Sequence, residues 1–445
     1  MIRRQRGWSP CALALLCLAA PRRLHGEAGP TTEDSVLGTI DVNGSAGTLP
    51  PLPKLAIAPL LSHGQGDEVA QQVARGDFSL SGQFDVLDED SSPSGPFLVE
   101  LPPDLAAWKE AGADYLVRVF SQAVEGTASR IMGEIYLTHS IPPPADAGAD
   151  VPVRPSFHTS VALSGDPRMA AHHLVDVLLG ALTGRPGGFA SRMAYTAQVG
   201  NARQVFVLDS DGFALHAASP PLATALSPAF GPGDVIYYAL SVALSPFRLA
   251  STPSGVPAPV QVPGSLMGVT FSEDRRTVLL VAMDEGESTI YLESGGKTQP
   301  YAKAPLANHP AFGPGGKIAY VAGSPVQRVY VDRRPVSPPG FMASAPVFCE
   351  TPQGLMLFYT VKTAAGSDIV ASYPNGQGLR RFTQRQARNW DPACSPDGRL
   401  LAYFSTREPG RGAGLYVAPI ARPWLAKKIL GQVGDSLRWG ALTVP

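Results

Sequence analysis

The side chains best suited to acid–base or metal chemistry do not form a recognisable catalytic motif in this sequence. His172 and His173 are adjacent in a predicted helix, so they point about 100° apart and cannot bind one metal ion together. Asp88, Glu89 and Asp90 could supply paired carboxylates, but they directly follow a predicted strand. A solvated charged loop is the favoured interpretation there. We therefore expect no active site built on these residues.

Two other motif types are missing from the sequence. A serine hydrolase needs a nucleophile turn of the G-x-S-x-G type, which does not occur among the 445 residues. The full phosphate-binding loop motif, G-x-x-x-x-G-K-[ST], does not occur either. The sequence indicates a protein that is not an enzyme and needs neither a cofactor nor a metal ion.

Three remaining residues have competing interpretations. For Cys349 and Cys394 we favour two small buried thiols over a disulfide bond, which an oxidising compartment would permit, and over a metal site. His309 has no second ligand at usable spacing, so a hydrogen-bonding role in a loop is favoured over metal binding.

Composition excludes some partners. The formal net charge is −1 and only 16% of residues are charged, so we expect no basic face for nucleic acid or anionic lipid. The 46 glycines and 44 prolines, in a chain that is 44% apolar, indicate many tight turns.

The first 28 residues have the features of a secretion signal. Arg3, Arg4 and Arg6 precede an apolar run, Cys11–Ala20, that is too short to cross a bilayer. We predict that the remaining chain is exported and not inserted in a membrane. Residues 29–53, rich in Gly, Thr, Ser and Pro, are predicted to be an extended arm with one strand at Val36–Val42.

Residues 54–184 alternate between strand and helix patterns, which predicts a small α/β domain. The expected strands are 54–61, 84–87, 114–121, 130–138 and 157–163, and the expected helices are 67–79, 105–110 and 168–182. Asp104 is predicted to cap the second helix. Gly184 and Pro186 then mark a hinge at 183–188.

Residues 189–445 consist of strand and turn patterns with an internal repeat. The clearest copy is Asn389–Tyr403, in which Pro396, Asp397 and Gly398 form a tight turn between two strands. Four more copies place Phe230, Phe271, Phe312 and Phe348 where this one has Cys394, at steps of 36 to 46 residues. This spacing fits the four-stranded blade of a β-propeller. A sixth, incomplete copy at 437–442 predicts six blades, with strands 192–198 and 203–208 completing the last one.

The order of these parts resembles the TolB family, the periplasmic component of the Tol-Pal system of Gram-negative bacteria. The resemblance is carried by a signal, the DVLDE strand, the WKEAGADYLV segment, RMAYTAQ, VLDSDG and the PAF/SPDG-like repeats, over about residues 36–445. It implies a monomeric, non-enzymatic periplasmic scaffold that supports outer-membrane integrity and constriction during cell division. Its propeller would bind the lipoprotein Pal, and its arm and N-terminal domain would bind the inner-membrane protein TolA.

The resemblance also implies where a partner would bind. The family's Pal-contacting positions lie in the loops that precede the innermost strands. The corresponding residues of this chain are Leu226, Met267, His309, Ser344, Asn389, Trp390, Asp391 and Arg438. A large aromatic and an Arg among small polar groups suit a protein-binding patch, although Trp390 could instead pack between blades. The alternative function is an exported propeller that binds a small ligand, glycan or ion in its channel, with or without hydrolase activity.

Overall fold

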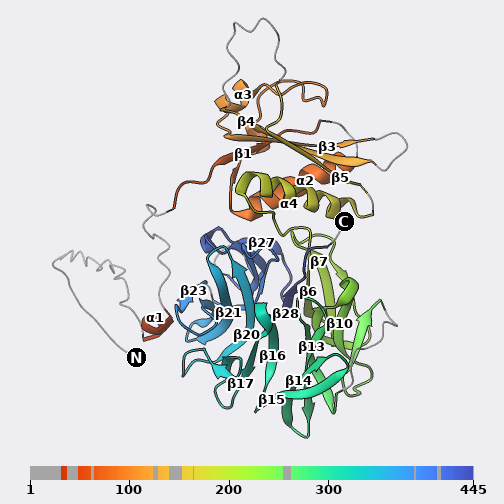
Figure 1. Cartoon of the computed structure of the whole chain (residues 1–445), viewed down its shortest axis with the longest axis vertical. Coiled ribbons are helices and arrows are strands. Elements are labelled where there is room, and N and C mark those ends of the chain that lie inside the picture. Colours follow the sequence, from red (N-terminus) through yellow and green to blue (C-terminus); the bar gives the residue numbers. More distant parts are fainter. Residues whose placement is uncertain are drawn as a thin grey trace, which may run out of the picture.

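The computed structural model has two parts, a small α/β domain and a β-propeller beneath it (Figure 1). The structure describes residues 32–37, 49–61, 65–123, 129–139, 153–163, 165–253, 262–384, 387–407 and 412–443. The predicted secretion signal therefore lies outside the described residues. The expected fold class, an α/β domain followed by a six-bladed propeller, is confirmed.

The N-terminal domain is a five-stranded sheet with helices on both faces. The sheet order is β2-β1-β3-β4-β5, in which β1 pairs in parallel with β2 and β3 and the other pairs are antiparallel. Its strands are β1 (Lys54–Ile57), β2 (Asp85–Val86), β3 (Tyr115–Gln122), β4 (Arg130–Leu137) and β5 (Phe157–Ala162). Helices α2 (Gln65–Ser81) and α4 (Pro167–Thr183) cover the face toward the propeller. The helix α3 (Leu105–Glu110) lies on the other face, where Trp108 packs on Leu116.

Local sequence explains how the helices begin and end. The Asp104 carboxylate accepts hydrogen bonds from the N–H groups of Ala106 and Ala107, which confirms the predicted cap of α3. Asp166 caps α4 in the same way, with Pro167 at the first helical position. Gly184 ends α4 with a φ of 78°, a conformation that glycine adopts without strain.

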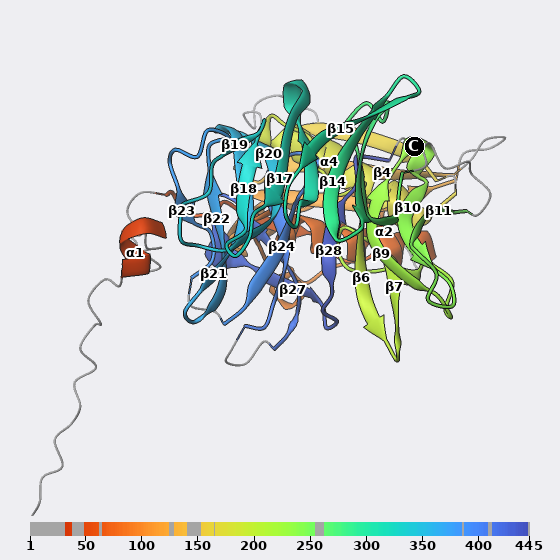
Figure 2. The same ribbon diagram turned by 90° about the horizontal axis from the view of Figure 1, so that it is seen from below.

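In the described residues the propeller consists of six β-sheets, the blades, which follow one another around a ring that the first and last strands of the propeller close (Figure 2). Blades 1 and 2 are built from β6 (Arg192–Val199), β7 (Ala202–Asp209), β8 (His216–Ala217), β9 (Thr224–Phe230), β10 (Ile236–Ser241) and β11 (Arg248–Thr252). Blades 3 and 4 are β12 (Ser265–Phe271), β13 (Thr277–Asp284), β14 (Glu287–Ser294), β15 (Lys297–Lys303), β16 (Asn308–Gly313), β17 (Lys317–Ala322), β18 (Arg328–Val331) and β19 (Arg334–Pro335). Blades 5 and 6 are β20 (Ala343–Thr351), β21 (Gly354–Thr363), β22 (Gly366–Ser372), β23 (Arg380–Arg381), β24 (Asn389–Cys394), β25 (Leu400–Ser405), β26 (Gly414–Pro419) and β27 (Lys427–Leu430).

The ring closes as the sequence predicts. The last strand, β28 (Asp435–Trp439), is the innermost strand of blade 1 and pairs antiparallel with β6, in the sheet order β28-β6-β7-β8. Strands from the two ends of the propeller sequence thus share one sheet. The closing pair makes β28 the inner strand of the blade, so β6 is paired on both sides.

A disulfide bond joins Cys349 and Cys394, so the favoured expectation of two free thiols is wrong. Their Cα atoms lie 5.6 Å apart, within the usual range for a disulfide. Cys349 belongs to β20 and Cys394 to β24, the innermost strands of neighbouring blades. The two residues sit at offset positions in the repeat, but the inner strands run side by side around the channel. The contact between these neighbouring strands brings the two sulfur atoms together.

The predicted strand at Val36–Val42 is also wrong where the structure describes it. Residues Thr32–Leu37 form a short helix, α1, while residues 38–42 lie outside the described part. Leu37 is fully buried against blades 4 and 5, and Glu33 Oε1 accepts a hydrogen bond of 2.8 Å from the N–H of Ala364. Glu33 and Leu37 are four residues apart and therefore lie on one face of α1, so both side chains contact the propeller.

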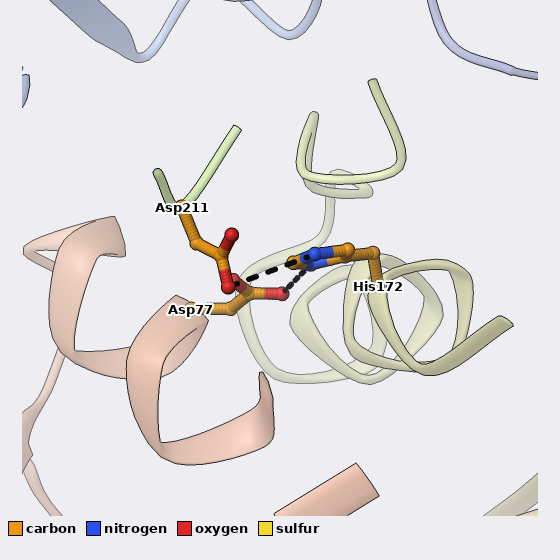
Figure 3. Close-up of side chains that lie close together, drawn as sticks. All are labelled: Asp77, His172 and Asp211. Atoms are coloured by element: carbon orange, nitrogen blue, oxygen red, sulfur yellow. Dashed lines mark hydrogen bonds and ion pairs between the residues drawn. The ribbon is translucent and has the colours of Figure 1, made fainter. Parts of the chain in front are cut away.

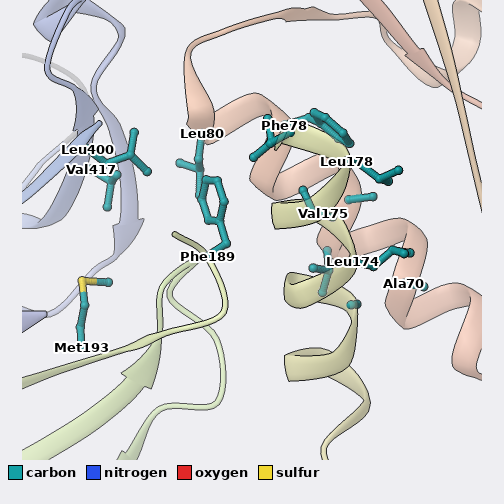
Figure 4. Close-up of a cluster of buried hydrophobic side chains, with 14 of the residues drawn as sticks. Ala70, Phe78, Leu80, Leu174, Val175, Leu178, Phe189, Met193, Leu400 and Val417 are labelled. Atoms are coloured by element: carbon teal, nitrogen blue, oxygen red, sulfur yellow. The ribbon is translucent and has the colours of Figure 1, made fainter. Parts of the chain in front are cut away.

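The two domains share a buried interface. Within it, His172 of α4 contacts Asp77 of α2 (Figure 3). Beside this polar pair, one apolar cluster runs from the α2–α4 pair into blades 1 and 6, with Leu80, Phe189 and Leu400 among its members (Figure 4). Because these side chains are fully or almost fully buried, the domains are joined by a continuous core as well as by the segment at 184–191.

Candidate protein-binding face of the propeller

The propeller has two unlike faces because its innermost strands all run in one direction. The N-terminal domain covers the face where these strands end, through contacts such as Arg399 Nη1 with Thr183 Oγ1 (3.0 Å) and Arg422 Nη1 with the carbonyl oxygen of Gly82 (3.3 Å). The opposite face, where the innermost strands begin, points away from that domain (Figures 1 and 2). We call it the distal face.

The innermost strands enter the channel from the distal face through a repeated backbone irregularity. Ser227, His309, Ala345, Asp391 and Ser436 each have a φ between 46° and 56°, and the strand pairing shifts register beside each of them. A bulge of this kind re-aims side chains and breaks the regular alternation. The eight expected site residues lie in these innermost strands, close to the bulges at the distal face.

The structure brings three of the eight expected site residues together. His309, Asp391 and Arg438 come from blades 4, 6 and 1, and the charges of Asp391 and Arg438 both act on the ionisation of His309. Burial lowers the pKa of His309 and of Arg438, while the Asp391 carboxylate opposes both shifts. The Asp391 carboxylate also accepts a hydrogen bond from the N–H of Ser436, which ties blade 6 to β28.

The other five residues contribute to packing in the inner strands. Asn389 is completely buried, and its amide bonds Ser367 and Ser405. Trp390 stacks on Phe404, with ring centroids 5.8 Å apart. Leu226, Met267 and Ser344 are half-buried in β9, β12 and β20. None of the eight is an exposed residue, so a partner would meet the surrounding loops first.

Those loops carry an apolar rim that the sequence analysis missed. Among the described residues, nine aliphatic or Met side chains that are exposed by 36% or more lie in or beside the loops of the distal face: Val199, Leu222, Val242, Leu244, Met283, Leu306, Val326, Met342 and Val433. Leu222 and Leu244 are exposed by 93% and 101%. Apolar residues at turn positions, as in PPLATA and SVALSP, are the sequence signal that could have revealed this rim.

Comparisons with known proteins agree with this architecture. A family model for the TolB amino-terminal domain matches residues 39–138. The crystal structure of TolB from Acinetobacter baumannii superposes with a TM-score of 0.66 at 16% identity, covering 88% of this chain and 97% of that one. The chain is a divergent relative of TolB. The fold match includes both domains in the same order.

Sequence relatives of this TolB-like chain carry the name Tol-Pal system protein TolB. The protein from Polaromonas naphthalenivorans is 28% identical over 204 residues, which is 43% of this chain and 41% of the relative. The protein from Anaeromyxobacter sp. strain K is 30% identical over 227 residues, which is 50% of this chain and 47% of the relative. The chain thus spans about half the length of the curated relatives it matches. Across the described residues, the structure contains no helix of the length and apolar character that crossing a membrane requires.

Proposed function

We propose that this TolB relative is a non-enzymatic periplasmic scaffold of a Tol-Pal envelope system. In this proposal the distal face binds a Pal-like, peptidoglycan-associated lipoprotein, and the N-terminal arm and domain bind a TolA-like inner-membrane protein. Linking these partners would support outer-membrane integrity and constriction during division. The sequence relatives named for the Tol-Pal system support the family part of the proposal.

The apolar rim is the observation that carries the binding part. Large exposed apolar patches on soluble proteins mark interaction sites, because water contact with them is unfavourable. The rim surrounds a channel entrance where Asp391 supplies a buried charge, and Arg438 lies deeper in the channel. An apolar contact zone around a few buried polar groups suits a protein partner.

Substitutions in the rim can test partner binding with little effect on stability. Leu222 and Leu244 are almost fully exposed, so Leu222→Ser and Leu244→Ser should change the free energy of unfolding by no more than about 0.5 kcal/mol. If both leucines contact Pal, the double variant should weaken binding of the soluble Pal domain by roughly 10-fold to 100-fold. Isothermal titration calorimetry with purified proteins would measure this affinity.

A matched control lies on the opposite face. Leu215 is 38% exposed in the turn after β7, beside the N-terminal domain, and Leu215→Ser should leave Pal affinity unchanged. Arg438→Ala tests the channel contribution separately and should also weaken binding. Wild-type protein that fails to bind Pal, or rim variants that bind as tightly as wild type, would contradict the proposal.

The competing function, a small ligand in the channel, has one structural feature in its favour. A cavity of about 280 Å³ opens at the end of the channel nearer the N-terminal domain and is lined by Phe230, Phe271, Phe312, Arg438 and Trp439. A tight small ligand found here by native mass spectrometry, together with absence of Pal binding, would favour this second function.

A further inference from the structure

A buried ionic cluster joins the N-terminal domain to the propeller. Asp77 lies in α2, His172 in α4, and Asp211 in the turn that follows β7 of the propeller (Figure 3). His172 Nδ1 is 2.6 Å from Asp77 Oδ2, and His172 Nε2 is 3.8 Å from Asp211 Oδ2. The side chains of His172 and Asp77 are fully buried, and that of Asp211 is 5% exposed.

The geometry of the ring indicates its charge. Each imidazole nitrogen faces a different carboxylate, one from each domain. A neutral imidazole that donates its Nδ1–H to Asp77 would turn the lone pair of Nε2 toward Asp211, whereas an imidazolium turns a second N–H toward it, at an ion-pair distance and not a hydrogen-bond distance. A lone pair of Nε2 directed at a buried carboxylate would be repelled. The arrangement therefore fits the protonated form of His172.

The charges around the ring also favour the protonated form of His172. Arg168 of α4 bonds Asp211 through Nη2 and lies 3.6 Å from Asp209 through Nε. Arg192 lies 3.6 Å from Asp209 as well as from the half-exposed Asp166. The buried carboxylates of Asp77, Asp209 and Asp211 thus face two guanidinium groups, and with all three carboxylates ionised a protonated His172 makes these six groups neutral.

The neighbouring groups on α4 do not supply this missing charge. Asp176, whose charge also acts on Asp77, accepts hydrogen bonds from the N–H groups of Phe189 and Ala190, and burial raises its pKa to about 7. Burial and the charge of His172 lower the pKa of His173. Burial alone would also lower the pKa of His172, but the charges of Asp77, Asp211 and Asp209 outweigh it and raise that pKa to about 9.

A metal ion suits this site less well than a proton. Asp77, His172 and Asp211 are side chains that could ligate a metal, yet the Oδ2 atom of Asp211 already bonds the Arg168 guanidinium. An added divalent cation would lie against that positive charge in a buried environment, where like charges repel strongly. The two carboxylates also meet different nitrogens of the ring and do not converge on one of them.

We propose that protonated His172 is a proton-dependent lock between the N-terminal domain and the propeller, which loosens when the ring loses its proton in alkaline solution. Loss of the proton leaves three buried carboxylates facing two guanidinium groups, and it removes the positive charge of the ring that lies between Asp77 and Asp211. The apolar cluster and the contacts of Arg399 and Arg422 with the N-terminal domain remain, so the domains stay connected. The blade 1 side of the interface, which holds the cluster, gains freedom.

The direction in which interface stability changes with pH follows from the pKa shift of His172. The pKa of His172 rises on folding, so its contribution to interface stability is complete below its ordinary pKa of about 6.5 and is lost as the pH rises through about 9. Burial raises the pKa of Asp77 from 3.8 to about 6. Its contribution to stability is therefore also lost as the pH rises, but at lower pH than that of His172. The lock should therefore loosen between about pH 7 and pH 10.

Two measurements on the wild-type fold test the lock. NMR titration of the imidazole ring nitrogens should give His172 a pKa near 9. Double electron–electron resonance between spin labels at Val177→Cys in α4 and Ser294→Cys in blade 3 should show one narrow interdomain distance at pH 7. The distribution should broaden with the same midpoint as the ring titration.

Substitutions distinguish the effect of deprotonating His172 from nonspecific destabilisation of the protein at high pH. His172→Gln should broaden the distance distribution at pH 7 and remove its change between pH 7 and pH 10. Asp77→Asn should lower the midpoint of both titrations by at least one pH unit. His173→Gln, on the same helix but half-buried, is the matched control and should behave as wild type.

The proposal would be overturned if His172 titrates near 6.5, or if the wild-type distance stays narrow to pH 10. A stoichiometric metal ion in the purified protein, whose removal broadens the distance at pH 7, would also overturn it. If His172→Gln does not fold, the two wild-type titrations decide the question alone.

Discussion

The indole Nε1 of Trp390 donates a hydrogen bond to the carbonyl oxygen of Gly434, 2.8 Å away, across the seam where the propeller closes. Trp390 belongs to the first residues of β24, and Gly434 directly precedes β28. A residue expected to anchor a partner therefore also joins blade 6 to blade 1.

Replacing this indole should destabilise the protein. Trp390→Ala loses the hydrogen bond and the packing on Phe404, so we expect a loss of about 3 kcal/mol in the free energy of unfolding. Trp390→Phe keeps a ring and should lose only about 1 kcal/mol. Urea unfolding would measure both. Trp424→Ala, at a side chain that is 48% exposed, is the control and should stay within about 0.5 kcal/mol.

The Trp390 variants also distinguish a role of this side chain in packing from a role in binding Pal. If Trp390 also contacts Pal, Trp390→Ala should weaken binding by about 2 kcal/mol under conditions where the variant is folded. Unchanged affinity in the folded variant would restrict Trp390 to its role in ring closure.

Removing the disulfide should cost stability because it releases a long loop. Cys349 and Cys394 are 45 residues apart, so the double variant Cys349→Ala/Cys394→Ala should unfold with about 3–4 kcal/mol less free energy. Differential scanning calorimetry with and without dithiothreitol provides the check. The reductant should lower the Tm of the wild type and leave the double variant unchanged; equal Tm values in all four samples would contradict the prediction.

Gly398 should tolerate substitution much less well than its counterpart in blade 4. Both Gly398 and Gly316 end the turn after an innermost strand, with φ of 70° and 75°. A Cβ at Gly398 would lie 1.9 Å from the carbonyl oxygen of Glu350 in blade 5, whereas a Cβ at Gly316 would meet no atom within 4 Å. We expect Gly398→Ala to lose about 3 kcal/mol of unfolding free energy. Gly316→Ala should lose only about 1 kcal/mol, from backbone strain; similar losses would exclude the interblade contact as the cause.

His309 should make the fold sensitive to acid. Its pKa is lowered, first by burial, so its contribution to stability is present above the ordinary pKa of about 6.5 and is lost as the pH falls below that value. His309→Gln should reduce the decrease in Tm between pH 7.5 and pH 5, measured by thermal unfolding. His216→Gln, at an exposed histidine of β8, is a control that should leave the pH dependence unchanged.

Much of the fold could be predicted from short-range patterns. The turn at Ser395–Gly398 forms as expected, because Asp397 Oδ1 accepts a hydrogen bond from the N–H of Arg399 and Gly398 takes a positive φ. Helix caps such as Asp104 depend on residues two or three positions away. The repeat and the incomplete sixth copy predict the blade number and the pairing of β28 with β6, because each blade is a nearly independent unit.

The remaining features depend on residues that are distant in the chain. The disulfide needs the contact between two neighbouring inner strands, and the helix α1 is stabilised by Leu37 and Glu33 contacting blades 4 and 5. The apolar rim appears only when loops from different blades lie on one face. Likewise, the sequence shows His172 only as half of a histidine pair, and the tertiary structure places it between Asp77 and Asp211. Local patterns fix turns and elements, whereas burial and charge at a given side chain are set by neighbours that only folding supplies.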